Sequence, residues 1–169
     1  ILLAEQLPEL MKAGLDAVNI SLDTLAAETF ERITRRSALP QVLQGLEKAL
    51  SYPSLKVKVN CVPTFQPEAD LIQIAGLARE NLLHVRFIEM MPIGLGKEFT
   101  ARGEEQIKAV LERAYGSMTP TGERLGNGPC HYYTLENFQG RIGFISALSH
   151  KFCAHCNRVR LTSTGFMKG

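Results

Sequence analysis

The chain has no tryptophan, only 7% aromatic residues and no apolar run of the about 18 residues that a membrane span needs. Its 19 basic and 17 acidic residues leave a formal net charge of only +2. This balance predicts neither a nucleic acid nor a membrane surface as partner. No signal-peptide pattern is present, so we predict a soluble, cytoplasmic protein.

Only four cysteines occur, and without a secretory signal they predict reduced thiols or metal ligands rather than disulfides. With 169 residues, of which 45% are apolar, the chain can build the core of one ordinary domain. It starts without methionine and stops at Gly169 within a pattern. We therefore expect a piece of a longer polypeptide. Cys61 and Cys130 lie in apolar or loop surroundings and are interpreted as packing residues.

The first two-thirds of the sequence alternates between helical and strand patterns. Hydrophobic residues recur every second position in three segments and at helical spacing between them. Strand, helix and strand in succession predict parallel pairing with right-handed crossovers, hence an α/β fold. Strands are expected at 16–23, 55–61 and 84–90, and helices at 5–13, 26–33, 41–50 and 68–80.

Polar residues occur toward the ends of all three expected strands. Parallel strands covered on both faces usually read as continuous apolar runs. The carboxyl ends of the strands form the functional mouth of a β/α barrel. We therefore predict a site there, with solvated edge positions as the alternative. The residues concerned are Ser21, Asp23, Lys58, Asn60 and Arg86.

The pattern changes after Met91, and we place a boundary between residues 1–97 and 98–169. A loop leads into an amphipathic helix at 104–115, followed by a stretch rich in glycine and proline. Segments 131–135 and 141–146 alternate like strands and are separated by a turn. They predict a β-hairpin in the C-terminal extension.

Cys153 and Cys156 have CxxC spacing and run into a basic segment of strand periodicity. Arg158 and Arg160 share a parity, so on a strand they point the same way and can bind an anion, with solvated strand arginines as the alternative. The two thiols fit half a zinc site, a redox dithiol or a ligand pair of an iron–sulfur cluster. A redox pair normally opens a helix, which the strand pattern disfavours. Zinc and a cluster both remain open.

Several strings in order along the chain resemble the GTP 3′,8-cyclases of molybdenum cofactor biosynthesis (molybdenum cofactor biosynthesis protein A). These are radical S-adenosylmethionine (SAM) enzymes. The resemblance covers essentially the whole chain, and its most specific part is the last string. The strings are Val18-Asn-Ile-Ser-Leu-Asp23, Lys58-Val-Asn60, Arg86-Phe-Ile-Glu-Met-Met91 and Phe152-Cys-x-x-Cys-Asn-Arg-Val-Arg-Leu-Thr-x-x-Gly165.

The resemblance implies the later half of an incomplete (α/β)6 radical SAM barrel plus a C-terminal extension with an auxiliary [4Fe–4S] cluster. The Cys-x3-Cys-x2-Cys motif of the SAM cluster is absent from this chain. The third auxiliary-cluster cysteine would directly follow Gly169. By motif, the resemblance assigns Cys153 and Cys156 to the cluster, Lys58, Arg86, Arg158 and Arg160 to GTP, and Ser21 and Met91 to SAM.

The implied reaction is a lyase reaction that converts GTP to (8S)-3′,8-cyclo-7,8-dihydroguanosine 5′-triphosphate through a SAM-derived radical. Cyclic pyranopterin monophosphate synthase would act next, and a homodimer is possible. No catalytic residue is assigned within this chain, which we expect to be inactive alone. The alternatives are another radical SAM enzyme with an auxiliary cluster, or a non-catalytic zinc-knuckle module that binds a nucleotide or a partner.

Overall fold

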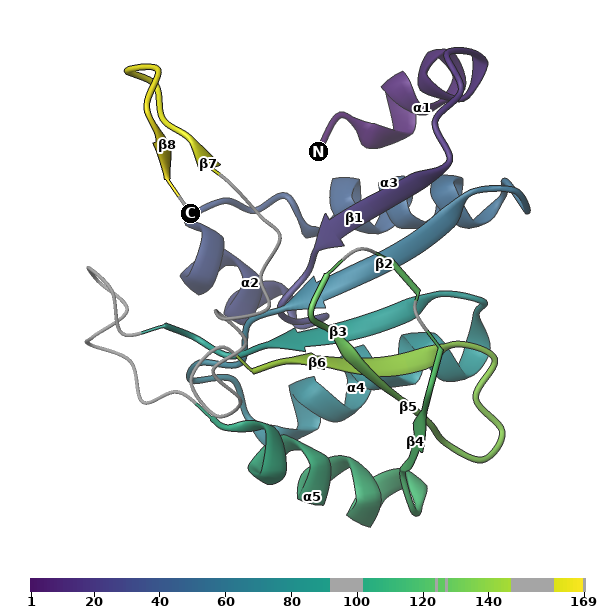
Figure 1. Ribbon diagram of the computed structural model, residues 1–169, viewed down its shortest axis with the longest axis vertical. Coiled ribbons are helices and arrows are strands. Elements are labelled where there is room, and N and C mark those ends of the chain that lie inside the picture. Colours follow the sequence, from purple (N-terminus) through teal and green to yellow (C-terminus); the bar gives the residue numbers. More distant parts are fainter. Residues whose placement is uncertain (92–101, 124, 127, 147–159, 169) are drawn as a thin grey trace.

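The computed structural model describes residues 1–91, 102–123, 125–126, 128–146 and 160–168. Its centre is a six-stranded sheet of order β1-β2-β3-β6-β5-β4, in which the first four strands are parallel and the last two antiparallel (Figure 1). The α/β class is therefore confirmed. The strands are β1 (Ala17–Ser21), β2 (Lys56–Cys61), β3 (His84–Ile88), β4 (Thr119–Thr121), β5 (His131–Thr134) and β6 (Arg141–Ile145).

Helices alternate with the parallel strands, as the sequence pattern predicts. They are α1 (Leu3–Lys12), α2 (Ala27–Thr34), α3 (Leu39–Leu50), α4 (Glu68–Glu80) and α5 (Glu104–Tyr115). In Figure 1, α3 and α4 lie behind the sheet. Within the described residues, no helix is both long and apolar enough to cross a bilayer.

Alternation with a period of two decides which face of each strand packs on the helices. In β2, the side chains of Val57, Val59 and Cys61 are buried, whereas Lys56 is exposed and Lys58 and Asn60 are only partly covered. The buried face packs in one core with apolar residues of α4 such as Leu71 and Ile74. The other face is left for polar groups.

The predicted hairpin of β5 and β6 is confirmed, and it joins the main sheet. Strand β6 is parallel to β3 on one side and antiparallel to β5 on the other. The sequence analysis missed β4, a three-residue strand that contains Pro120. Proline is tolerated there because β4 is an edge strand. The domain boundary at residue 97 stays a prediction.

A second, two-stranded sheet consists of β7 (Arg160–Leu161) and β8 (Met167–Lys168), paired antiparallel. The intervening turn uses Gly165 at φ +83°, in the left-handed region that favours glycine. Leu161, Phe166 and Met167 are exposed on this hairpin. The strand expected around Arg158 and Arg160 is thus described only from Arg160 onward.

Candidate functional site

The face of the parallel strands that does not pack on helices, here called the polar face, carries two rows of side chains. The strand register fixes these rows, because residues at paired positions in adjacent strands lie side by side. The first row contains the cations Lys58 and Arg141, and the second contains Arg86. The first row is Asn19, Lys58, His84 and Arg141, and the second is Ser21, Asn60, Arg86 and Gly143.

Arg86 on β3 is held by two asparagines from two other strands. Its Nε donates to Oδ1 of Asn60 on β2, and its Nη2 donates to Oδ1 of Asn19 on β1, both at 2.8 Å. Both acceptors are neutral amides, and within the described part of the chain Arg86 forms no ion pair. The guanidinium is therefore oriented while its positive charge remains uncompensated.

Lys58 lies beside Arg86 and beneath the segment that joins β4 to β5. Its ammonium group donates a hydrogen bond to the carbonyl oxygen of Leu125. Figure 1 shows this segment crossing in front of β2. Burial lowers the pKa of Lys58, and the charge of Arg86 lowers it further. The two cations thus form a partly desolvated positive centre, which favours binding of an anion.

Strand β5 contributes Tyr132 and, just before it, Cys130 to the same neighbourhood. Gly143 makes room for them, since a Cβ atom there would lie 2.5 Å from Cys130 Sγ and 2.9 Å from Tyr132 Cε1. Burial raises the pKa of the Cys130 thiol to about 11 and also raises that of the Tyr132 hydroxyl, while Arg86 opposes both shifts. At neutral pH both groups are therefore uncharged, and they border the site as polar groups that can form hydrogen bonds.

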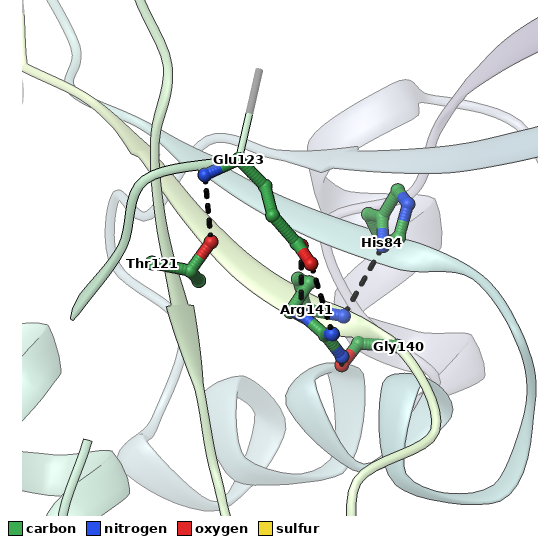
Figure 2. Close-up of polar contacts among 5 residues, drawn as sticks. All are labelled: His84, Thr121, Glu123, Gly140 and Arg141. Carbon is green, nitrogen blue, oxygen red and sulfur yellow. Dashed lines mark hydrogen bonds and ion pairs between the residues drawn. The ribbon is translucent and has the colours of Figure 1, made fainter. Parts of the chain in front are cut away.

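The amino-terminal end of the polar face has a different arrangement. Figure 2 shows Arg141 in a bidentate pair with the Glu123 carboxylate, with Nε–Oε2 at 3.1 Å and Nη2–Oε1 at 3.4 Å. The backbone N–H of Arg141 donates to Nδ1 of His84 at 3.2 Å. Burial, followed by the charges of Lys58 and Arg141, lowers the pKa of His84 to about 4. At this end of the polar face, the Glu123 carboxylate neutralises the charge of Arg141, and the polar groups bond to one another.

A buried polar network fixes the loops that follow β1 and β2. The Thr24 hydroxyl donates to Asp70 Oδ2 at 2.5 Å, and Gln66 Nε2 donates to the carbonyl oxygens of Asp23 and Val62. The carboxylate of Asp23 accepts the backbone N–H of Val62 at 2.7 Å. Burial raises the pKa of Asp23. The predicted mouth position Asp23 is therefore engaged in the scaffold of the loop.

The structure places four of the predicted site residues on the polar face, and Asn60 lies between Ser21 and Arg86 in the second row. Ser21 and Arg86 belong to one row and Lys58 to the next. Met91 is 43% exposed and lies three residues after the end of β3, the strand that contains Arg86. Cys153, Cys156 and Arg158 lie outside the described residues, and of Arg160 only the strand position is described. Their assigned roles stay predictions.

Neither of the described cysteines suits a metal. Cys61 is buried in the core, as the sequence analysis predicts, and burial raises its pKa well above the usual value. Cys130 is likewise disfavoured as a thiolate by its raised pKa. Within the described ranges, no group of three or more His, Cys, Asp or Glu residues is arranged to hold a metal ion.

Comparison with known proteins identifies the family. The sequence pattern that defines Molybdenum Cofactor Synthesis C matches residues 83–169, which is just over half of the chain. The chain belongs to the Molybdenum Cofactor Synthesis C family. The resemblance found in the sequence motifs is thereby confirmed at the level of the family.

Relatives of this family member are named GTP 3′,8-cyclase. The protein of Clostridium perfringens (strain 13 / Type A) is 43% identical over 169 residues, which cover 99% of this chain and 52% of that protein. The protein of Syntrophomonas wolfei is 44% identical, covering 95% of the chain and 50% of that protein. The protein of Moorella thermoacetica is 41% identical over 94% and 50%. The chain spans about half the length of these relatives.

The sequence analysis assigned no role to Asn19 or Tyr132 and interpreted Cys130 as a packing residue, whereas all three border the cationic centre. Asn19 lies two positions before Ser21, and residues two apart on a strand point to the same face, so the sequence could have placed Asn19 on the polar face. Cys130, just before β5, has the same parity as Tyr132 on that strand. What the sequence could not show was the register that brings Asn19 of β1 within hydrogen-bonding distance of Arg86 on β3.

Proposed function

We propose that this chain is the C-terminal half of a radical SAM GTP 3′,8-cyclase and that the polar face binds GTP. The observation that supports this most directly is the pair of cations, Lys58 and Arg86, set among neutral hydrogen-bonding groups in a member of this family. A nucleoside triphosphate carries about four negative charges and needs several convergent cations. Arg158 and Arg160 would supply the others from the C-terminal segment.

The proposed product is (8S)-3′,8-cyclo-7,8-dihydroguanosine 5′-triphosphate, made on an incomplete (α/β)6 barrel of which β1, β2 and β3 are later strands. Ser21 and Met91 would contact SAM at the carboxyl end of this sheet. Cys153 and Cys156 would ligate the auxiliary [4Fe–4S] cluster, which would supply iron for binding the substrate. The chain's own residues would bind and orient GTP and exclude water.

The proposal also includes a second cluster, the enzyme that acts next, the oligomeric state and the location in the cell. A second [4Fe–4S] cluster, outside this chain, would bind SAM, so the 169-residue chain alone would be inactive. Cyclic pyranopterin monophosphate synthase would use the product, and a homodimer and a cytoplasmic location remain predictions. These statements rest on the family resemblance and on the names of the relatives.

The test is equilibrium GTP binding by the complete polypeptide under anaerobic conditions, with Lys58→Gln compared against Lys56→Gln. Lys56 is a matched control, because it lies on the same strand and face, one alternation before Lys58. We expect Lys58→Gln to weaken binding about 10- to 100-fold, the worth of one hydrogen bond to a charged group. Lys56→Gln should change it little. Equal losses in both variants would indicate non-specific attraction and contradict the proposed site.

The zinc-knuckle module is the alternative function, and anaerobic reconstitution distinguishes it. A brown protein that holds iron and sulfide supports the cluster proposal. A colourless protein that takes up zinc at Cys153 and Cys156, and binds no iron, supports the module instead.

A further inference from the structure

We propose that Asn19 is a positioning residue that holds Arg86 in place for the substrate triphosphate while leaving the charge of Arg86 intact. The inference rests on the proposed function and deepens it. Neither the motifs nor the names of the relatives give Asn19 a role.

The first argument is geometric. Arg86 reaches across two strands, since its hydrogen bonds end on β2 and on β1 at 2.8 Å each. Two fixed points on a planar guanidinium define its plane and its rotation about the long axis of the side chain. Asn60 alone would hold the group only at Nε. Asn19 supplies the second point, so orientation depends on it.

The second argument concerns charge. A guanidinium presents five N–H donors and stays protonated at any physiological pH, so it needs acceptors whether or not a ligand is present. A carboxylate would satisfy those donors but would also cancel the charge that an anionic ligand needs. Amide oxygens satisfy two of the donors and add no charge. Because arginine only donates, both asparagines must present their oxygen atoms to it.

The third argument comes from the place of Asn19 itself. Asparagine is disfavoured within β-strands, and Asn19 lies at the centre of β1 with its side chain exposed. It adds nothing to the hydrophobic core, whose contribution from β1 comes from the neighbouring Val18 and Ile20. The contact with Arg86 is therefore the structural reason for an amide at this position.

The experiment compares Asn19→Ala and Asn19→Asp in the complete polypeptide, measuring both the Kd for GTP and the thermal unfolding temperature. Asn19→Ala removes the contact, and we expect GTP binding to weaken about tenfold. Asn19→Asp keeps an acceptor but places a negative charge against Arg86. We expect it to weaken binding further, by about 10- to 100-fold, because like charges repel the triphosphate.

The unfolding temperatures separate positioning from a purely structural role. Asn19→Asp should unfold at the same temperature as the wild type or higher, since it replaces a hydrogen bond by an ion pair with Arg86. If the role of Asn19 were purely structural, Asn19→Asp would change both the Kd for GTP and the unfolding temperature less than Asn19→Ala does. Wild-type affinity in Asn19→Ala, or in Asn19→Asp, would overturn the inference while leaving the proposed function in place. A wild-type protein that binds no GTP would overturn both.

Discussion

The two arginines of the polar face lie on adjacent strands, yet they are held in opposite ways. Arg86 is cradled by the amides of Asn19 and Asn60, whereas Arg141 forms a bidentate pair with the Glu123 carboxylate. The first arrangement orients a cation and keeps its charge, and the second cancels it. Because both arginines lie on the same sheet face, the chemistry of their partners, and not their location, decides which of them keeps its charge.

The carboxyl end of the polar face depends on the missing side chain at Gly143, opposite Arg86. In Gly143→Ala the new Cβ would collide with Cys130 Sγ and the Tyr132 ring, both closer than normal contact. We expect the free energy of unfolding to fall by about 1–3 kcal/mol, the usual cost of overpacking. Urea denaturation measures it.

Gly122→Ala is the matched control for this substitution. A Cβ at Gly122 meets nothing within 4 Å, and its φ lies outside the left-handed region. It should change stability by no more than a few tenths of a kcal/mol, in either direction. A loss as large as that of Gly143→Ala would show that glycine is needed for the segment as a whole and not for the approach of β5.

His84 tests the amino-terminal end of the comparison. Its pKa is lowered from 6.5 to about 4 by burial and then by its cationic neighbours, so the folded state favours the neutral ring. The unfolded chain binds the proton first as the pH falls. The stability due to the neutral ring is therefore complete above pH 6.5 and is lost as the pH falls through about 4. The charged groups that act on it are Lys58, Arg141, Glu123 and Arg86.

We expect this loss to be on the order of 1 kcal/mol, because the ring is only partly buried and solvent screens the charges. His84→Asn keeps an acceptor near the backbone N–H of Arg141 but cannot titrate. Urea denaturation between pH 7 and pH 4 should therefore show a shallower decline in the variant than in the wild type. Parallel declines would mean that the carboxylates of the chain, and not His84, produce the pH dependence.

Local periodicity was sufficient to predict the α/β class, the three parallel strands and the hairpin of β5 and β6. It succeeded because a strand with one face on the core must alternate, as β2 does from Lys56 to Cys61. It failed at β4, whose three residues are too few to show a period and include Pro120. Pairing with β5 stabilises that strand, and such pairing is invisible to a local pattern.

The candidate site was predictable only in part, for a related reason. Parity placed Ser21, Lys58 and Arg86 on comparable faces, and the family motifs selected them. The contact between Asn19 and Arg86 joins residues 67 positions apart, and only the register of three strands creates it. The proposed cluster ligands Cys153 and Cys156 rest on spacing and resemblance, since they lie outside the described residues.

Glu123→Gln gives Arg141 the arrangement that Arg86 has, because Arg141 would then be held by a neutral amide and not by a carboxylate. The lost ion pair is partly exposed, with side-chain exposures of 27% for Arg141 and 48% for Glu123. We therefore expect the free energy of unfolding to fall by only about 0.5 kcal/mol, within the range of surface ion pairs.

The Arg141 charge would become available to anions in Glu123→Gln, so inorganic triphosphate should bind somewhat more tightly at low salt and gain nothing at high salt. Isothermal titration at two salt concentrations measures the effect, with Glu9→Gln, which removes an exposed helical pair with Lys12 far from the sheet face, as the charge-matched control. Equal gains in both variants would mean that the affinity follows net charge alone, and the partner chemistry of Arg141 would then have no part in it.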